Sequence, residues 1–144
     1  IRKYDVEDTA VVNFVFKSGA LGTLSVSDTI VSPWSYELTA GENPAYPITN
    51  QSAYYIGGTK SSIQFPNYKE WYNKQERSWW KPILHKDEST RESRYTLTNQ
   101  INHLCDVVNK KAKPKITGED GLVSLKIFAA IIKSAKTGKK VKIK

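Results

Sequence analysis

The side chains best suited to bind a small molecule in this sequence are its aromatic residues. The chain has four Trp and eight Tyr among 144 residues, and several of them stand beside turns and polar loops. An indole or phenol ring presents a flat apolar face that can stack on a sugar-like ring. The residues that we expect to face such a ligand are Trp34, Tyr36, Trp79, Trp80 and His103. The same rings would also serve as core filling or as the centre of a protein interface.

Motifs for catalysis or cofactor binding are missing from the sequence. It contains neither G-x-G-x-x-G nor G-x-x-x-x-G-K-[ST], so no cofactor-binding residue can be named. The two histidines, His85 and His103, have no Cys or His partners at metal-site spacing, and we expect no metal. No Ser-His-Asp arrangement has geometric support, and we name no catalytic residue. His103 and Gln100 lie three residues apart on an expected helix, where they would contact another element, a ligand or a neighbouring domain.

The net charge is compatible with a domain whose lysines are only solvated surface and with a domain that binds an anionic partner. The net charge is +8, with lysines concentrated at residues 110–115 and 133–144. Lysines there serve the helix dipole and protect sheet edges. The alternative is a free-standing basic module for an anionic partner such as nucleic acid. Cys105 is the single cysteine; we expect it to be a small core residue, and a chain without an intrachain disulfide fits the reducing cytoplasm.

The first two thirds of the chain is predicted to consist of short strands. Val6–Phe16 and Leu21–Val26 form a hairpin around Gly19, and Ser35–Ala40 is a third strand, before a polar loop over residues 41–51. A second hairpin joins Ala53–Gly57 to Ser62–Phe65. Further strands are expected at Trp71–Tyr72 and Trp79–Leu84, and the charged stretch Asp87–Arg94 is a surface connection.

The last third is predicted to be helical. Apolar residues recur at helical spacing over 97–109 and again over 122–135. Thr117 is a good N-cap for the second helix, because its hydroxyl can accept a hydrogen bond from the backbone near Asp120. Gly138 offers the left-handed position that ends a helix. Val141–Ile143 alternates with lysines as a terminal strand.

Strands grouped before helices indicate an α+β domain. We expect an open, mainly antiparallel sheet with the two C-terminal helices packed on one face. The other face carries apolar residues too, so we expect a homo-oligomer that buries it. The longest apolar run is far too short to cross a membrane.

Four stretches of the chain resemble one enzyme family. The first, VEDTAVVNFVFKSGALGTLSVS, is similar to the opening hairpin of the C-terminal domain in the glucose–fructose oxidoreductase/inositol dehydrogenase (Gfo/Idh/MocA) family. The segments SPWSYELTAGENPAYP and YYIGGTKSSIQFP resemble the next segments of that domain. The tail QINHLCDVVNKKAKPKITGEDGLVSLKIFAAIIKSAKTGKKVKI is the most specific part. Ser61 and Lys110 stand where the family usually has Gly, and Leu104 stands where it usually has Phe.

The resemblance implies a dihydrodipicolinate-reductase-like C-terminal domain spanning residues 1–144. Family members are two-domain NAD(P)-dependent oxidoreductases that act on sugars, cyclitols and related polyols. Their Rossmann domain, catalytic lysine and D-x-x-x-H pair precede the part that this chain resembles. The chain starts with Ile1 and contains no Met, so we expect a fragment that is inactive alone. Its partners would be its own Rossmann domain, further copies of itself and a small sugar-like substrate.

Overall fold

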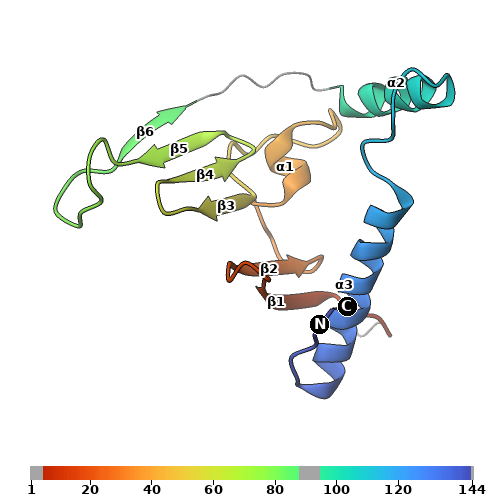
Figure 1. Ribbon diagram of the computed structural model, residues 1–144, viewed down its shortest axis with the longest axis horizontal. Coiled ribbons are helices and arrows are strands. Elements are labelled where there is room, and N and C mark those ends of the chain that lie inside the picture. Colours follow the sequence, from red (N-terminus) through yellow and green to blue (C-terminus); the bar gives the residue numbers. More distant parts are fainter. Residues whose placement is uncertain (1–4, 88–94, 144) are drawn as a thin grey trace. The chain divides into compact units, whose positions relative to one another are not determined.

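The computed structural model describes residues 5–87 and 95–143. The chain divides into two compact units (Figure 1). One unit combines Ile1–Ile30 with Asn102–Lys144, and the other is Val31–Ile101.

The first unit opens with a hairpin. Strand β1 (Thr9–Val15) pairs antiparallel with β2 (Leu21–Ser27), with Thr9 opposite Ser27 and Val15 opposite Leu21. At the turn the N–H of Gly19 donates to the carbonyl of Phe16 at 3.0 Å, and Gly19 has φ 88°. This left-handed backbone is accessible to glycine at little cost. The predicted first hairpin is therefore confirmed.

Two helices occupy the C-terminal part, as predicted. Helix α2 covers Thr96–Val108 and α3 covers Gly118–Thr137. The hydroxyl of Thr117 accepts from the Asp120 N–H at 3.3 Å, while the Asp120 carboxylate accepts from the Thr117 N–H at 2.8 Å. These reciprocal bonds form a capping box. At the other end Gly138 has φ 66° and closes α3 as a left-handed C-cap.

The second unit contains a four-stranded antiparallel meander in the order β3-β4-β5-β6. Its strands are β3 (Tyr54–Gly57), β4 (Ser61–Phe65), β5 (Lys69–Tyr72) and β6 (Leu84–Asp87). The predicted second hairpin is thus β3–β4, and the strand expected at Trp71–Tyr72 is the end of β5.

Three predicted strands are wrong. Residues 35–40 instead form the short helix α1 (Tyr36–Ala40), which Ser35 precedes in extended geometry and Gly41 ends at φ 65°. The polarity pattern over residues 35–40 is too short to distinguish a single helical turn from a strand. The strand expected at Trp79–Leu84 begins only at Leu84, because Pro82 cannot donate to a ladder. Val141–Ile143 is not a strand; a strand needs a partner, and none of the described strands pairs with it.

The chain is α+β, with antiparallel sheets and its longer helices at the C-terminal end, as expected. The strands form two sheets, of two and four strands, in place of one broad sheet. Packing of α2 and α3 on a sheet face stays a prediction, since Leu104 is 56% exposed and Leu125 is 66% exposed. No helix within the described ranges is both long enough and apolar enough to cross a bilayer. Most of the predicted surface connection, residues 88–94, lies outside the described residues.

Candidate functional site

A row of polar side chains crosses one face of the four-stranded sheet. Tyr55 is opposite Gln64, Gln64 is opposite Lys69, and Lys69 is opposite Asp87. Directly opposed residues of antiparallel strands project to the same face. The row therefore places two charged groups, an amide and a phenol side by side on four consecutive strands. We call it the polar row.

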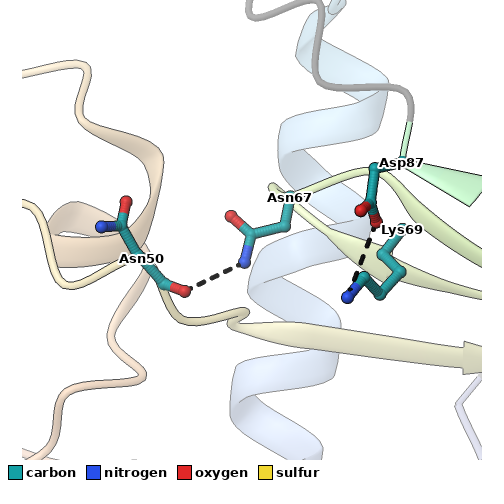
Figure 2. Close-up of polar contacts among 4 residues, drawn as sticks. All are labelled: Asn50, Asn67, Lys69 and Asp87. Carbon is teal, nitrogen blue, oxygen red and sulfur yellow. Dashed lines mark hydrogen bonds and ion pairs between the residues drawn. The ribbon is translucent and has the colours of Figure 1, made fainter.

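A pocket of about 410 Å³ lies over the polar row. The segment before β3 and the turn between β4 and β5 complete its lining with Asn50, Gln51, Ser52 and Asn67. The Asn67 side-chain amide donates to the carbonyl of Asn50 at 3.3 Å, which ties this turn to the segment (Figure 2). We call this space the sheet pocket; all of its lining residues belong to the second unit.

The charged pair of the polar row is loosely held. Lys69 Nζ lies 3.6 Å from Asp87 Oδ1, and the two side chains are 32% and 54% exposed (Figure 2). A hydrogen bond from nitrogen to oxygen is usually about 2.7–3.2 Å long, so the pair retains capacity for other polar groups. Lys69 Nζ also lies 5.4 Å from the centre of the Trp71 ring. The Trp71 ring in turn contacts the His85 ring, with centroids 4.9 Å apart.

Ser52 adds a buried hydroxyl beside this pocket. Its side chain is only 3% exposed, and within the described residues its oxygen has no hydrogen-bond partner. Burial of a hydroxyl without a partner is costly. Ser52 is therefore a place where a small rearrangement or a bound polar group would gain a hydrogen bond.

The opposite face of the sheet carries a different arrangement. Glu70 lies on β5 between the polar-row residue Lys69 and Trp71, so its side chain projects to the other face. There its carboxylate bonds Lys86 at 3.0 Å. The hydrogen bond from Lys86, and a second from Ser61, lower the pKa of Glu70. This face provides a matched control for substitutions in the polar row.

An aromatic cluster joins α1 to the sheet of the second unit. Tyr36 stacks on Phe65 at 6.1 Å and lies 6.0 Å from Tyr54, and Tyr68 meets Phe65 edge-on at 5.0 Å. The Tyr36 hydroxyl donates to Glu42 Oε1 at 2.7 Å. Burial, together with this bond and the charge of Glu42, raises the pKa of Tyr36 to about 12. The phenol of Tyr36 is therefore committed to a partner within the chain.

The residues predicted to face a ligand have different settings. Trp34 is 54% exposed just before α1, and Trp79 and Trp80 are 100% and 95% exposed in the loop between β5 and β6. Tyr36 belongs to the aromatic cluster, where its ring neighbours Tyr54 and Phe65 were not among the residues predicted. His103 is on α2 and accepts from the Lys115 N–H through Nε2 at 3.3 Å. That these residues face a ligand stays a prediction.

Sequence reasoning missed the polar row. Gln64, Lys69 and Asp87 look like ordinary surface residues when each strand is considered alone. Only the register places them on one face, and the register depends on the turns between the strands. Of these three residues, only Gln64 lay within an expected strand; Lys69 and Asp87 lay just outside the strands expected, so correct strand bounds were the missing signal.

Comparison with known families decides the identity of the domain. Residues 1–143 match the profile of the Gfo/Idh/MocA family, described as "Oxidoreductase family, C-terminal alpha/beta domain". The chain belongs to this family. Comparisons with curated proteins and with solved structures gave no match.

A nicotinamide dinucleotide, the usual cofactor of this oxidoreductase family, needs a site for its pyrophosphate. Pyrophosphate binds at helix N-termini, where free N–H groups and the helix dipole meet it. At α3 the Asp120 carboxylate instead accepts from the Thr117 N–H, and hydrogen bonds with Thr117 lower the pKa of Asp120. Glu119 adds a second acidic side chain in the same turn. This helix start repels a phosphate, so α3 does not offer the anion site that the cofactor would need.

Metal chemistry has no obvious set of ligands either. The described ranges hold no group of three or more His, Cys, Asp or Glu side chains that could bind an ion. Chemically, the sheet pocket and the exposed indoles can bind, orient and exclude water. They present no activated nucleophile among the groups described above.

Proposed function

We propose that this domain is the substrate-side and oligomer-forming half of an NAD(P)-dependent oxidoreductase that acts on a sugar, cyclitol or related polyol. The family match over residues 1–143 carries the proposal. An N-terminal Rossmann domain would bind the nicotinamide, and hydride would pass between that cofactor and a carbinol carbon of the substrate. The C-terminal domain would wall the substrate and position it.

Exposed aromatic side chains support the substrate-side role. The indoles of Trp34, Trp79 and Trp80 are free to be covered by a ligand or by another domain. An exposed indole offers a flat apolar face that can stack on the C–H face of a sugar ring. Tyr36 would act by holding α1 in place, since its hydroxyl already donates to Glu42.

Exposed apolar side chains support the oligomer-forming role. No apolar residue within residues 5–87 and 95–143 is fully buried, and Val11 on β1 and Leu21 on β2 are 72% and 78% exposed. Soluble proteins rarely leave such large apolar patches uncovered. We propose that further copies of the chain and the Rossmann domain cover them. Sedimentation of the full-length protein as a monomer at high concentration would contradict this part.

The direct test is nicotinamide-dependent turnover of polyols by the full-length protein. Trp80→Ala should raise KM for the accepted polyol several-fold, because stacking on an aromatic ring contributes on the order of 1 kcal/mol. Lys60→Ala, on the turn between β3 and β4, serves as a surface control and should leave KM unchanged. Unchanged KM and kcat for the Trp80 variant would remove this residue from the substrate contacts.

The second candidate is a basic module for nucleic acid, in keeping with the net charge of +8. Its lysines lie between α2 and α3 and after residue 132. A gel shift at increasing salt separates the two functions, because phosphate contacts give a steep fall of affinity with salt. We expect only weak, fully salt-sensitive binding. We also propose a cytoplasmic location, because Cys105 is exposed in place of the core position expected for it, and a reducing compartment would keep its thiol free.

A further inference from the structure

We propose that the sheet pocket binds a small zwitterion of the α-amino acid class, in which an ammonium and a carboxylate stand on neighbouring carbon atoms. The second unit alone builds this site, and the inference goes beyond the proposed polyol oxidation without depending on it. Three observations support it: the loosely held pair of Lys69 and Asp87, the buried hydroxyl of Ser52, and the pocket of about 410 Å³ that these residues line. Small-molecule pockets commonly have volumes of roughly 300–1,000 Å³.

The two opposed charges of the polar row match the two charges of a zwitterion. Lys69 Nζ and Asp87 Oδ1 are 3.6 Å apart, which is longer than the usual hydrogen bond of about 2.7–3.2 Å. Neither charge is therefore fully satisfied by the other. A ligand carboxylate can accept from Lys69 while the ligand ammonium donates to Asp87, so that charges of opposite sign alternate around the group. Hydrogen bonds between charged partners are the stronger kind in proteins.

The charge balance of the lining excludes other ligand classes. Lys69 and Asp87 are the charged residues of the lining, and their formal charges cancel. A simple anion would gain from the lysine but would also meet the carboxylate, and a simple cation would face the reverse. A single carboxylate provides too few ligands for a metal ion. A neutral molecule would leave both charges without a counter-charge. A zwitterion is the class in which both charges of the pocket meet their opposite.

Ser52 provides an independent sign of a ligand. The residue is 3% exposed, and its side-chain oxygen has no hydrogen-bond partner among the described residues. A buried hydroxyl without a partner costs free energy. The backbone beside it is fixed, because the Ala53 N–H donates to the carbonyl of Phe65 at 2.9 Å. A ligand carboxylate that accepts from the Ser52 hydroxyl as well as from Lys69 would remove this cost.

Amide side chains in the lining favour a ligand with a polar side chain of its own. Gln51, Gln64 and Asn67 each offer a carbonyl oxygen and an NH₂ group. Gln64 lies between Tyr55 and Lys69 in the polar row, so it is next to the lysine that would hold the ligand carboxylate. We therefore expect L-glutamine and L-serine to bind more tightly than L-leucine, whose side chain would leave these amides without partners.

The test is calorimetric titration of the full-length protein at neutral pH with L-glutamine, L-serine and glycine, without nicotinamide. Saturable binding of at least one of them is expected. Asp87→Asn keeps the shape of the side chain and removes its charge, which should weaken binding by about tenfold. The matched control is Glu70→Gln, which removes the same charge from the opposite face of the same sheet and should change the affinity by less than about twofold. Thermal unfolding verifies that both variants remain folded.

A second arm uses acetate and methylammonium, which each carry one of the two charges of glycine, and glycerol, which carries neither. All three should bind more weakly than the amino acids. Ser52→Ala should weaken amino-acid binding by about threefold without lowering the unfolding temperature, because the hydroxyl has no partner to lose in the free protein. A lower unfolding temperature with unchanged affinity would reject the role of Ser52.

The proposal would be overturned by a lack of saturable binding of all the amino acids, by equal affinities of the parent and Asp87→Asn, or by binding of acetate, methylammonium or glycerol as tight as that of the amino acids. Turnover of a polyol without Asp87-dependent binding of an amino acid would reject this site and leave the proposed function standing. Asp87-dependent binding without turnover of any polyol would support the site and reject that function.

Discussion

The bond between Tyr36 and Glu42 gives the sharpest prediction about the described structure. Tyr36→Phe deletes one oxygen atom and leaves the ring contacts with Phe65 and Tyr54 in place. A hydrogen bond to a charged group contributes about 1.5–3 kcal/mol. The bond is short, at 2.7 Å, but only partly buried, so the lower end of that range applies. We expect the free energy of unfolding to fall by about 1.5 kcal/mol.

The assay is urea unfolding monitored by Trp fluorescence, with the free energy taken from the midpoint at constant slope. Tyr54→Phe is the matched control. It also removes a hydroxyl from the aromatic cluster, but the hydroxyl that donates to Glu42 belongs to Tyr36. Its effect should stay below about 0.5 kcal/mol. A double-mutant cycle with Glu42→Ala should show coupling between the two side chains. Equal stability of Tyr36→Phe and the parent, or additive effects in the cycle, would refute the assignment of this bond.

The same bond predicts a dependence on alkaline pH. The pKa of Tyr36 is raised to about 12 in the folded chain, from an ordinary value of 10.0. Below the unfolded pKa both states keep the proton, and the contribution to stability is complete. As pH rises from about 10 towards 12, the unfolded state loses the proton first, so stability is lost over that window. Tyr36→Phe should lose less stability than the parent across it.

Two further predictions concern backbone positions in the two units. Gly58→Ala should destabilise the protein by roughly 1–3 kcal/mol, because a Cβ in the β3–β4 turn would lie 2.8 Å from the carbonyl oxygen of Ser61. The control is Gly121→Ala in α3, which should stabilise the protein by about 0.5–1 kcal/mol, because a Cβ there meets nothing within 4 Å. Similar changes in stability for both variants would contradict the turn geometry. Lys110→Gly should stabilise the protein by about 0.5–1 kcal/mol, because Lys110 has a left-handed backbone at φ 58°. The strain of that geometry in a residue with a Cβ is larger than the conformational entropy that a glycine loses on folding. Lys111→Gly, the neighbouring control, should destabilise, and thermal unfolding measures both pairs.

Local signals in the sequence predicted the elements whose ends are set by neighbouring residues. Thr117 and Asp120 determine where α3 begins, Gly138 determines where it ends, and Gly19 determines the first turn; all were found from sequence because capping and turns are local chemistry. The left-handed backbone of Lys110, at φ 58°, gives a physical reason for the Gly that the resemblance leads us to expect at this position.

Long-range contacts explain what was missed. Residues 141–143 have the alternation of a strand, but none of the described strands pairs with them, and pattern alone cannot supply a partner. The helix at Tyr36–Ala40 depends on the aromatic cluster, in which Phe65 comes from a strand far along the chain. The polar row needs the register of four strands at once, so no single stretch of sequence contains it.

The central claim is that this domain serves the substrate side of a nicotinamide-dependent polyol oxidoreductase. Its most direct test monitors the reduced nicotinamide spectroscopically while the full-length protein is supplied with NAD⁺ or NADP⁺ and a panel of sugars and cyclitols. We predict saturable reduction of one cofactor with at least one polyol, at a KM that Trp80→Ala raises. No reduction with any polyol, together with tight binding of nucleic acid that persists at physiological salt, would contradict the claim.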